Sequence, residues 1–283
     1  MHTALHQQIE TVTGKKVTAT RGLSGGCVGD VFAVDLDDGT RTVAKAGAPG
    51  SGLETEGWML DYLAAHSGLP VPKVLHADDT LLLMDFIETA GPLNDATQED
   101  AGRLVAALHD VSADAFGLER DTLIGGLHQP NPKTKNWIDF FRDQRLLFMA
   151  RAALDAGRLP SSTMTRLETL AANLDRFLEE PDAPQLIHGD MWTGNVLAGK
   201  NRIAGFVDPA IYYADGEIEL AFTTLFGTFG DAFFKSYGEI RPIRPGFFEE
   251  RCALYNIYPL LVHVRLFGGS YVSSVEGVLK KFL

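Results

Sequence analysis

The chain has 283 residues, of which 45% are hydrophobic and 22% are charged, and its formal net charge at pH 7 is -12. This composition is typical of folded globular proteins and excludes a disordered chain, while the length favours two compact lobes with a cleft between them. Because 37 acidic side chains outnumber 25 basic ones, the chain would repel a polyanion, and we expect no nucleic-acid partner.

The chain contains only two cysteines, Cys27 and Cys252, which are too few for a disulfide scaffold or a four-thiolate zinc site. No run of about 18 apolar residues occurs, and residues 1–10 lack the charged-then-apolar layout of a secretory signal. We therefore expect a cytoplasmic protein with reduced thiols and no membrane partner.

The N-terminal part has the pattern of strands and turns. Apolar residues at 31–34 and 42–44 flank an Asp-Asp-Gly turn at 37–39 and predict an antiparallel hairpin. Apolar residues at helical spacing predict a helix over 53–66, and the apolar run 80–87 predicts a buried strand. A turn-rich segment follows at 91–94, so we place the lobe boundary after residue 87.

The remaining chain, 88–283, has mainly helical patterns, at 98–110, 137–156, 161–180, 216–237 and 247–267. Two short apolar runs, 185–187 and 203–207, interrupt these helices, and each ends at a polar residue that could face a cleft. The sequence therefore predicts an α+β protein with a small antiparallel β-sheet lobe followed by a mainly helical lobe.

The strongest functional signal is the string from His188 to Asn195, followed by Asp208 after the next apolar run. Asp190 precedes Asn195 by five residues and Asp208 by eighteen, the separations of the catalytic Asp, its Asn and the metal-binding Asp in protein kinases. Carboxylate and amide oxygens suit Mg²⁺, so Asn195 and Asp208 are predicted to hold this ion with ATP. Asp190 would orient or deprotonate an acceptor hydroxyl. Each residue alone also fits a turn or helix cap, but the joint spacing favours a kinase.

The N-terminal part supplies a matching ATP-binding half. The glycine-rich segment with Gly25, Gly26 and Cys27 lies between two strand-like runs, where backbone N–H groups can approach phosphates, although Gly-Gly is also a common turn. The predicted strand that follows ends at Lys45, whose charge could neutralise the α- and β-phosphates.

Lys45 needs a carboxylate partner, and the next helix offers Glu54 and Glu56. Glu56 shares a helix face with Met59 and Leu63, so we predict that it points inward to Lys45. Alternatively, both carboxylates could only stabilise the first turn through the helix dipole.

These residues resemble the fructosamine and ketosamine kinases, relatives of the aminoglycoside and choline kinases with a protein-kinase-like fold. The resemblance spans nearly the whole chain, and Trp192 after His-Gly-Asp distinguishes this family from its relatives. The strings that carry it lie at 25–27, 54–57, 132–146, 188–195, 208–213, 217–221 and 267–271.

The resemblance implies phosphorylation of the 3-hydroxyl of a ketoamine, formed when a reducing sugar glycates a free amine or a protein lysine. The product breaks down and releases the amine, which implies a role in deglycation repair. The adduct could be fructosyl-, ribulosyl- or erythrulosyl-lysine.

The resemblance also assigns roles to single residues. Asp190 is the base, Asn195 and Asp208 hold the metal, and Lys45 and Glu56 serve ATP. The backbone of Asp85 and Ile87 would meet adenine, with Met84 behind it, and Trp192 would stack on the sugar. Glu217, His263 and Trp137 would lie on the acceptor side, although a histidine in an apolar run is often a core residue.

Two residues depart from the family pattern, Met191 where Leu is commoner and Asp85 where Glu is commoner, and neither removes a functional group. Cys27 matches a thiol that some members link to an intersubunit disulfide, so we expect a monomer or a redox-linked homodimer.

Two alternative functions stay open. One is a kinase of aminoglycosides, choline or homoserine, and the other is a nucleotide-binding pseudokinase that acts as a scaffold.

Overall fold

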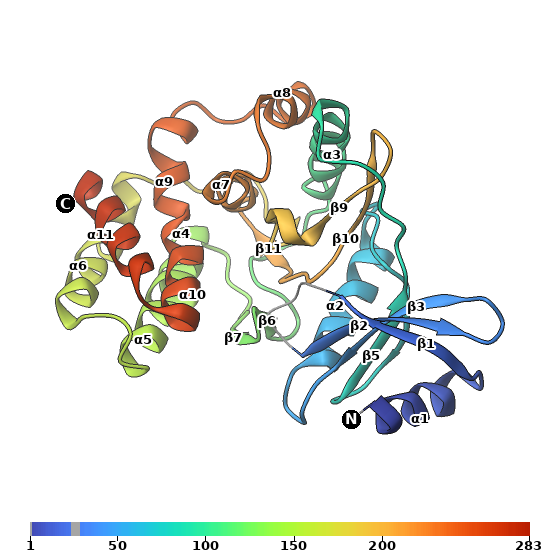
Figure 1. The fold of residues 1–283 in the computed structure, drawn as a ribbon. Helices are drawn as coiled ribbons and strands as arrows, with labels where there is room; N and C mark the ends of the chain where they lie inside the picture. Colours follow the sequence, from blue (N-terminus) through green and yellow to red (C-terminus); the bar gives the residue numbers. More distant parts are fainter. Residues whose placement is uncertain (1, 24–28) are drawn as a thin grey trace.

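The computed structural model describes residues 2–23 and 29–283 of the chain. Its N-terminal lobe is a five-stranded antiparallel sheet with the strand order β1-β2-β3-β5-β4 and two helices (Figure 1). The elements are α1 (His2–Thr13), β1 (Val17–Gly22), β2 (Asp30–Leu36), β3 (Arg41–Ala46), α2 (Leu53–His66), β4 (Val74–Ala77) and β5 (Leu81–Asp85). The predicted hairpin, the helix over 53–66 and the buried strand are confirmed.

The two helices of this lobe cover opposite faces of the sheet. Leu81 and Leu83 pack with α1, whereas Leu82 and Met84 pack with α2, because successive side chains of a strand point to opposite faces. Helix α1 was not predicted from the sequence. The α2 face of the sheet also carries Lys45, which pairs with Leu82 in the β3–β5 register.

The C-terminal lobe is mainly helical, as predicted, and adds three small antiparallel ladders. Its helices are α3 (Asp95–Leu108), α4 (Trp137–Phe140), α5 (Leu147–Asp155), α6 (Ser161–Ala171), α7 (Glu217–Leu225), α8 (Asp231–Ile240), α9 (Cys252–Tyr255), α10 (Ile257–Phe267) and α11 (Ser270–Phe282). The ladders pair β6 (Thr122–Ile124) with β7 (Leu127–Gln129), β8 (Gln185–Ile187) with β11 (Tyr212–Ala214), and β9 (Val196–Ala198) with β10 (Ile203–Phe206).

Four predicted helices are divided or shortened in the structure. The helix expected over 216–237 is divided into α7 and α8, because Gly227 has a φ of 63° and breaks the helix between them. The helix expected over 161–180 ends at Ala171, where the Asn173 side chain donates to the Thr169 carbonyl and competes with the helical hydrogen bonds. Two π-helical turns, Phe141–Leu146 and Phe247–Arg251, also interrupt the expected helices.

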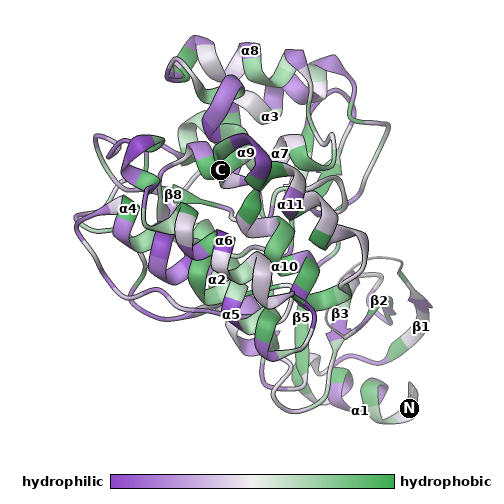
Figure 2. Ribbon diagram, turned by 90° about the vertical axis from the view of Figure 1, so that its left-hand side faces the viewer, coloured by the Kyte–Doolittle hydropathy of each residue, from purple (hydrophilic) through white to green (hydrophobic). Residues whose placement is uncertain are grey.

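The segment 86–94 connects β5 to α3, and the boundary predicted at residue 87 lies within it. In the C-terminal lobe one large cluster of hydrophobic side chains forms the core. Figure 2 shows hydrophobic and hydrophilic residues alternating along the outer helix α8, the pattern of a helix with one face on a core. Within the described ranges, none of the helices is long and apolar enough to span a bilayer.

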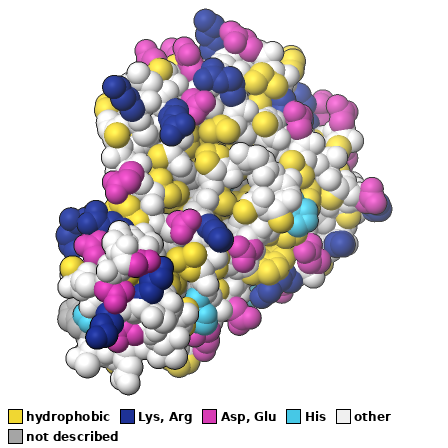
Figure 3. All heavy atoms as spheres, turned by 90° about the vertical axis from the view of Figure 1, so that its right-hand side faces the viewer, with side chains coloured by type: hydrophobic (Ala, Val, Ile, Leu, Met, Phe, Trp, Pro, Cys, Tyr) yellow, Lys and Arg dark blue, Asp and Glu magenta, His cyan; other side chains and the backbone are white. Residues whose placement is uncertain are grey.

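Figure 3 shows acidic and basic side chains interspersed on one face of the molecule. On the part of this face that the structure describes, no continuous basic area is visible.

The packing of α3 on α8 in the C-terminal lobe generates a stability prediction. A Cβ atom on Gly102 of α3 would lie 2.6 Å from the Phe233 carbonyl oxygen and 2.9 Å from the Tyr237 nitrogen of α8. We expect Gly102→Ala to lower the free energy of unfolding by about 1–3 kcal/mol, because the two backbones would have to separate.

Gly238 of α8 provides the control, because a Cβ atom there would meet nothing within 4 Å. Gly238→Ala should raise the free energy of unfolding by up to about 1 kcal/mol through helix propensity. Urea denaturation of both variants measures the difference, and equal stabilities would contradict the close packing of α3 on α8.

Candidate active site

Lys45 connects the two lobes through a buried group of charges. Its Nζ donates to Glu56 Oε1 at 2.6 Å and also pairs with Asp208 Oδ1, which follows β10 in the other lobe. Burial by itself would lower the pKa of Lys45, but the charges of Glu56 and Asp208 outweigh burial and raise it. Lys45 is 4% exposed and therefore stays charged between two carboxylates.

The catalytic-loop residues named from the sequence lie beside this group. Asn195 Nδ2 donates to the Asp190 carbonyl at 2.8 Å, to Asp190 Oδ2 at 3.1 Å and to the Asp208 carbonyl at 3.5 Å. Because Nδ2 faces the loop, Oδ1 is the atom of Asn195 that a cation would bind. Burial, aided by the Asp208 charge, raises the pKa of Asp190 to about 7.

A small cavity of about 50 Å³, here called the ion-pair cavity, lies where these residues meet. Its walls include Lys45, Glu56, Asp190, Asn195 and Asp208. The structure therefore brings together the five polar residues that the sequence assigned to catalysis, metal binding and the lysine partner. Glu56 forms the ion pair, whereas Glu54 is exposed on the first turn of α2.

Two positions in the loops have left-handed backbone conformations. Gly189 has a φ of 84°, and a Cβ atom there would collide with the Ala210 carbonyl oxygen. Asp208 has a φ of 54°, which is uncommon for a residue with a side chain. Ala210 N–H donates to the His188 carbonyl at 2.7 Å and holds the two loops against each other. Backbone strain of this kind persists where surrounding contacts fix a site.

Glu219 anchors the catalytic loop from behind, and sequence reasoning missed it. Glu219 Oε1 accepts from the Gly189 N–H at 2.7 Å, and Oε2 lies 3.0 Å from His109 Nε2. His109 Nδ1 lies 2.8 Å from the Tyr237 hydroxyl, and all three side chains are buried. The string 217–221 contains this residue, but two carboxylates two positions apart point to different sides of a helix, and sequence alone does not choose between them.

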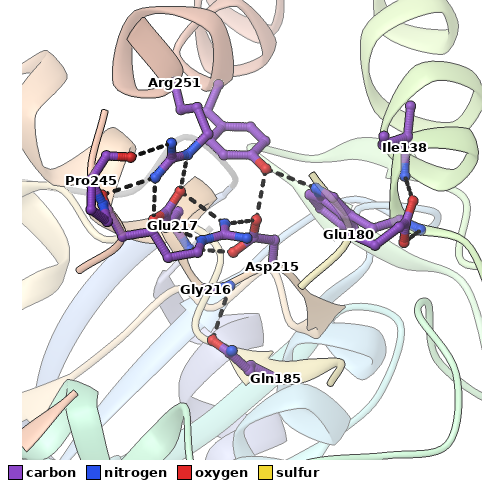
Figure 4. Close-up of polar contacts among 11 residues, drawn as sticks. Ile138, Glu180, Gln185, Asp215, Gly216, Glu217, Pro245 and Arg251 are labelled. Atoms are coloured by element: carbon purple, nitrogen blue, oxygen red, sulfur yellow. Dashed lines mark hydrogen bonds and ion pairs between the residues drawn. The ribbon is translucent and has the colours of Figure 1, made fainter. Parts of the chain in front are cut away.

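Glu217 lies in a different buried cluster, shown in Figure 4. It accepts from Arg251 Nε at 2.6 Å and from Arg244 Nε at 3.1 Å. Burial raises the pKa of Glu217, but hydrogen bonds from Arg251 and Arg244 outweigh burial and lower it below its usual value. Asp215 completes the cluster by accepting from the Tyr255 hydroxyl at 2.8 Å.

Trp137 belongs to the same network, because its indole Nε1 donates to Tyr255 at 2.8 Å and its ring is fully buried. Glu217 and Trp137 were expected on the acceptor side. The structure instead places both in the interior network, where their polar atoms are occupied by protein partners.

A second cavity, here called the aromatic cavity, opens beside Asp190 with a volume of about 410 Å³. Trp192 and His263, which the resemblance assigned to the acceptor side, both line it. His263 Nδ1 donates to the Pro259 carbonyl at 2.7 Å, and burial lowers the pKa of the ring. The remaining aromatic walls were not predicted and are Phe222, Phe226, Phe267 and Tyr271.

A third cavity of about 300 Å³, here called the hinge cavity, is also lined by Lys45. Met84, Asp85 and Ile87 line it, together with Asp208. The Asp85 N–H donates to the Lys73 carbonyl at 2.9 Å and is therefore already occupied. Gly25, Gly26 and Cys27 lie outside the described residues, so the phosphate loop and the Cys27 disulfide stay predictions.

Comparison with known proteins gives one consistent result. The sequence model of the fructosamine kinase family matches residues 1–283. A protein of Synechocystis sp. named as a ketoamine kinase is 34% identical over 286 residues, covering 98% of this chain and 95% of its own. The crystal structure of a Thermobifida fusca protein described as a fructosamine-3-kinase has a TM-score of 0.89 at 32% identity, covering 98% and 97% of the two chains.

The fold is also shared by a more distant enzyme. Aminoglycoside phosphotransferase APH(4)-Ia, solved with AMP-PNP and hygromycin B, has a TM-score of 0.68 at 16% identity and covers 98% of both chains. At this identity the likeness shows the fold alone. The predicted two-lobe protein-kinase-like fold is thereby confirmed.

The placement of Glu217 generates a prediction about stability. We expect Glu217→Gln to lower the free energy of unfolding by about 3 kcal/mol, because Arg251 would lose its buried counter-charge and Arg244 would keep only Asp215. Glu249→Gln is the matched control, since Glu249 is exposed and no ion pair is recorded for it within the described chain. Urea denaturation of the two variants measures the difference, and a Glu217→Gln protein as stable as the control would contradict the assignment.

Proposed function

The chain belongs to the fructosamine kinase family, and we propose that it transfers the γ-phosphoryl group of ATP to the 3-hydroxyl of a ketoamine, as part of deglycation repair. One observation carries the proposal. Asp190, Asn195, Asp208 and Lys45 line one cavity, which shares Lys45 and Asp208 with the hinge cavity and Asp190 with the aromatic cavity. This arrangement suits a reaction in which a nucleotide and an acceptor meet at these residues.

ATP would occupy the hinge cavity and extend towards Lys45. Adenine would lie between apolar side chains, with Met84 behind it and the backbone of Asp85 and Ile87 at its polar edge. Lys45 would neutralise the α- and β-phosphates, and its ion pair with Glu56 fixes the ammonium in position. The glycine-rich segment with Gly25, Gly26 and Cys27 would cover the phosphates.

Asp208 and Asn195 would hold Mg²⁺ on the phosphates. The residues fit this role, because the Asp208 carboxylate and Asn195 Oδ1 are hard oxygen ligands at one point of the cleft. Within the described chain, no group of three or more His, Cys, Asp or Glu side chains could hold a metal by itself. Such an incomplete protein site is typical of Mg²⁺, which takes its other ligands from phosphates and water and neutralises the charge of the transferred group.

Asp190 would act on the acceptor hydroxyl. It lines both the ion-pair cavity and the aromatic cavity, so its carboxylate can accept a hydrogen bond from a hydroxyl that faces the γ-phosphate. The hydroxyl oxygen forms the new bond to phosphorus, ADP leaves, and the hydroxyl proton passes to Asp190. Burial and Asn195 hold the carboxylate in place for this step.

The aromatic cavity favours a ketoamine over an aminoglycoside. Asp190 is the one carboxylate among the residues that line it, and the other walls are aromatic, aliphatic or neutral. A polycation would find a single counter-charge there, whereas a sugar can stack on Trp192 and its amine on the other rings. Choline is the second candidate, because an aromatic cavity also suits a quaternary ammonium.

Substitution of the two aspartates tests the enzyme assignment. We expect Asp190→Asn and Asp208→Ala each to lower kcat by about a hundredfold or more, since both side chains act on the transition state. Asp175→Asn, at an exposed position, is the control and should leave kcat unchanged. ADP release with Mg²⁺, ATP and a panel of fructosyl-lysine, ribulosyl-lysine, kanamycin and choline measures the effect.

The panel also separates the candidate substrates. The proposal predicts turnover with fructosyl-lysine or ribulosyl-lysine and little with kanamycin or choline. Near-normal turnover in either aspartate variant would overturn the residue roles, and a preference for kanamycin or choline would overturn the substrate class.

A further inference from the structure

The β6–β7 hairpin reaches the reaction centre from a part of the chain that the proposed mechanism does not use. In Figure 1 it lies between the N-terminal sheet and the helices of the C-terminal lobe. Its turn residue Gly125 lines both the ion-pair cavity and the aromatic cavity, and Asp190 and Trp192 are the two other residues that line both. Gly125 therefore lies where the phosphoryl group and the acceptor hydroxyl would meet.

The turn at position 125 favours glycine but does not require it. The hairpin loop has two residues, Gly125 and Gly126, with φ values of 54° and 79°. Tight hairpin turns of this kind are commonly formed by Asn-Gly, because asparagine tolerates positive φ. A Cβ atom on Gly125 would lie 3.1 Å from Leu266 Cδ1, and Leu266 is itself a wall of the aromatic cavity. A side chain at position 125 would therefore press on a wall of the aromatic cavity.

A buried polar network fixes the hairpin to the loop that carries Asp208. Gln129 Nε2 donates to the Ala210 carbonyl at 3.0 Å, and Thr122 Oγ1 donates to the Ile211 carbonyl at 3.3 Å. The Tyr258 hydroxyl donates to Gln129 Oε1 at 2.7 Å and ties the hairpin to α10, the helix of His263. The hairpin is therefore held on the two elements that form the metal side and the acceptor side of the site.

Arg145 anchors the same network without a carboxylate partner in the described part of the chain. Its guanidinium donates to the Pro130 carbonyl at 2.8 Å and to Asn131 Oδ1 at 2.6 Å. Its Cζ lies 3.8 Å from the centre of the Tyr212 ring. Because this arginine is fully buried, carbonyl and ring contacts must stabilise its charge, and the segment that follows β7 has little freedom to move.

The hairpin also contacts the N-terminal lobe. A Cβ atom on Gly52, next to the first residue of α2, would collide with Leu123 of β6. Glu56, the partner of Lys45, lies on the first turn of the same helix. The hairpin thus packs against both lobes at the residues that frame the ion-pair cavity.

From these contacts we infer that the β6–β7 hairpin is the specificity element of the acceptor site, with Gly125 leaving room for the sugar carbons next to the reacting hydroxyl. The acceptor class is a ketoamine, so the inference rests on the proposed function. A side chain at position 125 would occupy the space beside Asp190 and Trp192. It would push the acceptor away from the phosphate while leaving the hinge cavity unchanged.

Substitution of Gly125 tests this inference through acceptor and nucleotide kinetics measured separately. Gly125→Asn keeps a residue that tolerates positive φ and adds a side chain, and Gly125→Ala adds a smaller one. We expect the KM for the ketoamine to rise about tenfold or more in Gly125→Asn and less in Gly125→Ala. The KM for ATP should stay within about twofold of wild type, because the hairpin does not line the hinge cavity.

Gly157→Asn is the matched control, because Gly157 has a φ of 67° and a Cβ atom there would meet nothing within 4 Å. Gly157→Asn also places an asparagine at a positive φ, but it adds no side chain to the acceptor site. Thermal unfolding of all variants checks that they fold. A ketoamine KM that matches the Gly157→Asn control, or KM values for ATP and ketoamine that rise together, would overturn the inference.

The wild-type protein separates this inference from the proposed function. If wild type uses another acceptor of the panel, the ketoamine assignment fails, and the same KM comparison with that acceptor still tests the hairpin. If Gly125→Asn fails to fold, the KM values of Gly125→Ala for the ketoamine and for ATP are compared in the same way. A wild-type protein that phosphorylates no member of the panel would overturn both proposals.

Discussion

The buried contact of Lys45 with Glu56 and Asp208 determines how the two lobes face each other. A lysine so deeply buried needs counter-charges, and here one comes from its own lobe and one from the other. Desolvation opposes the burial of such groups, whereas removal of one partner would leave a buried charge uncompensated. The contact lines the ion-pair cavity, which shares Lys45 and Asp208 with the hinge cavity and Asp190 with the aromatic cavity, so the geometry of the proposed transfer depends on it.

The second lobe supports this contact with a rigid loop. Glu219 holds the Gly189 N–H from behind, and the left-handed backbone at Gly189 and Asp208 turns Asp190 and Asp208 towards the cleft. On the other side, the β6–β7 hairpin is fixed to the residues after Asp208 by buried hydrogen bonds. Two sets of buried polar contacts therefore position Asp190 and Asp208. A preorganised site of this kind suits phosphoryl transfer, in which the protein must stabilise charge.

Local sequence patterns predicted part of this arrangement. The spacing of Asp190, Asn195 and Asp208 and the helical phase of Glu56 depend on short-range geometry, and the structure brings these residues together. Which side chains pair inside the helical lobe depends on tertiary packing, which local sequence patterns do not show. Glu217 and Trp137 were therefore expected at the acceptor side, whereas in the structure they are hydrogen-bonded to Arg251 and Tyr255. The β6–β7 hairpin escaped prediction because its strands have only three residues each, too few to show an alternating pattern.

The most direct test of the account is a crystal structure with Mg²⁺, a non-hydrolysable ATP analogue and a ketoamine bound together. The account predicts the triphosphate between Lys45 and Asp208, and the 3-hydroxyl of the sugar beside the Asp190 carboxylate in the aromatic cavity. A nucleotide bound away from Lys45, or an acceptor bound outside this cavity, would contradict it.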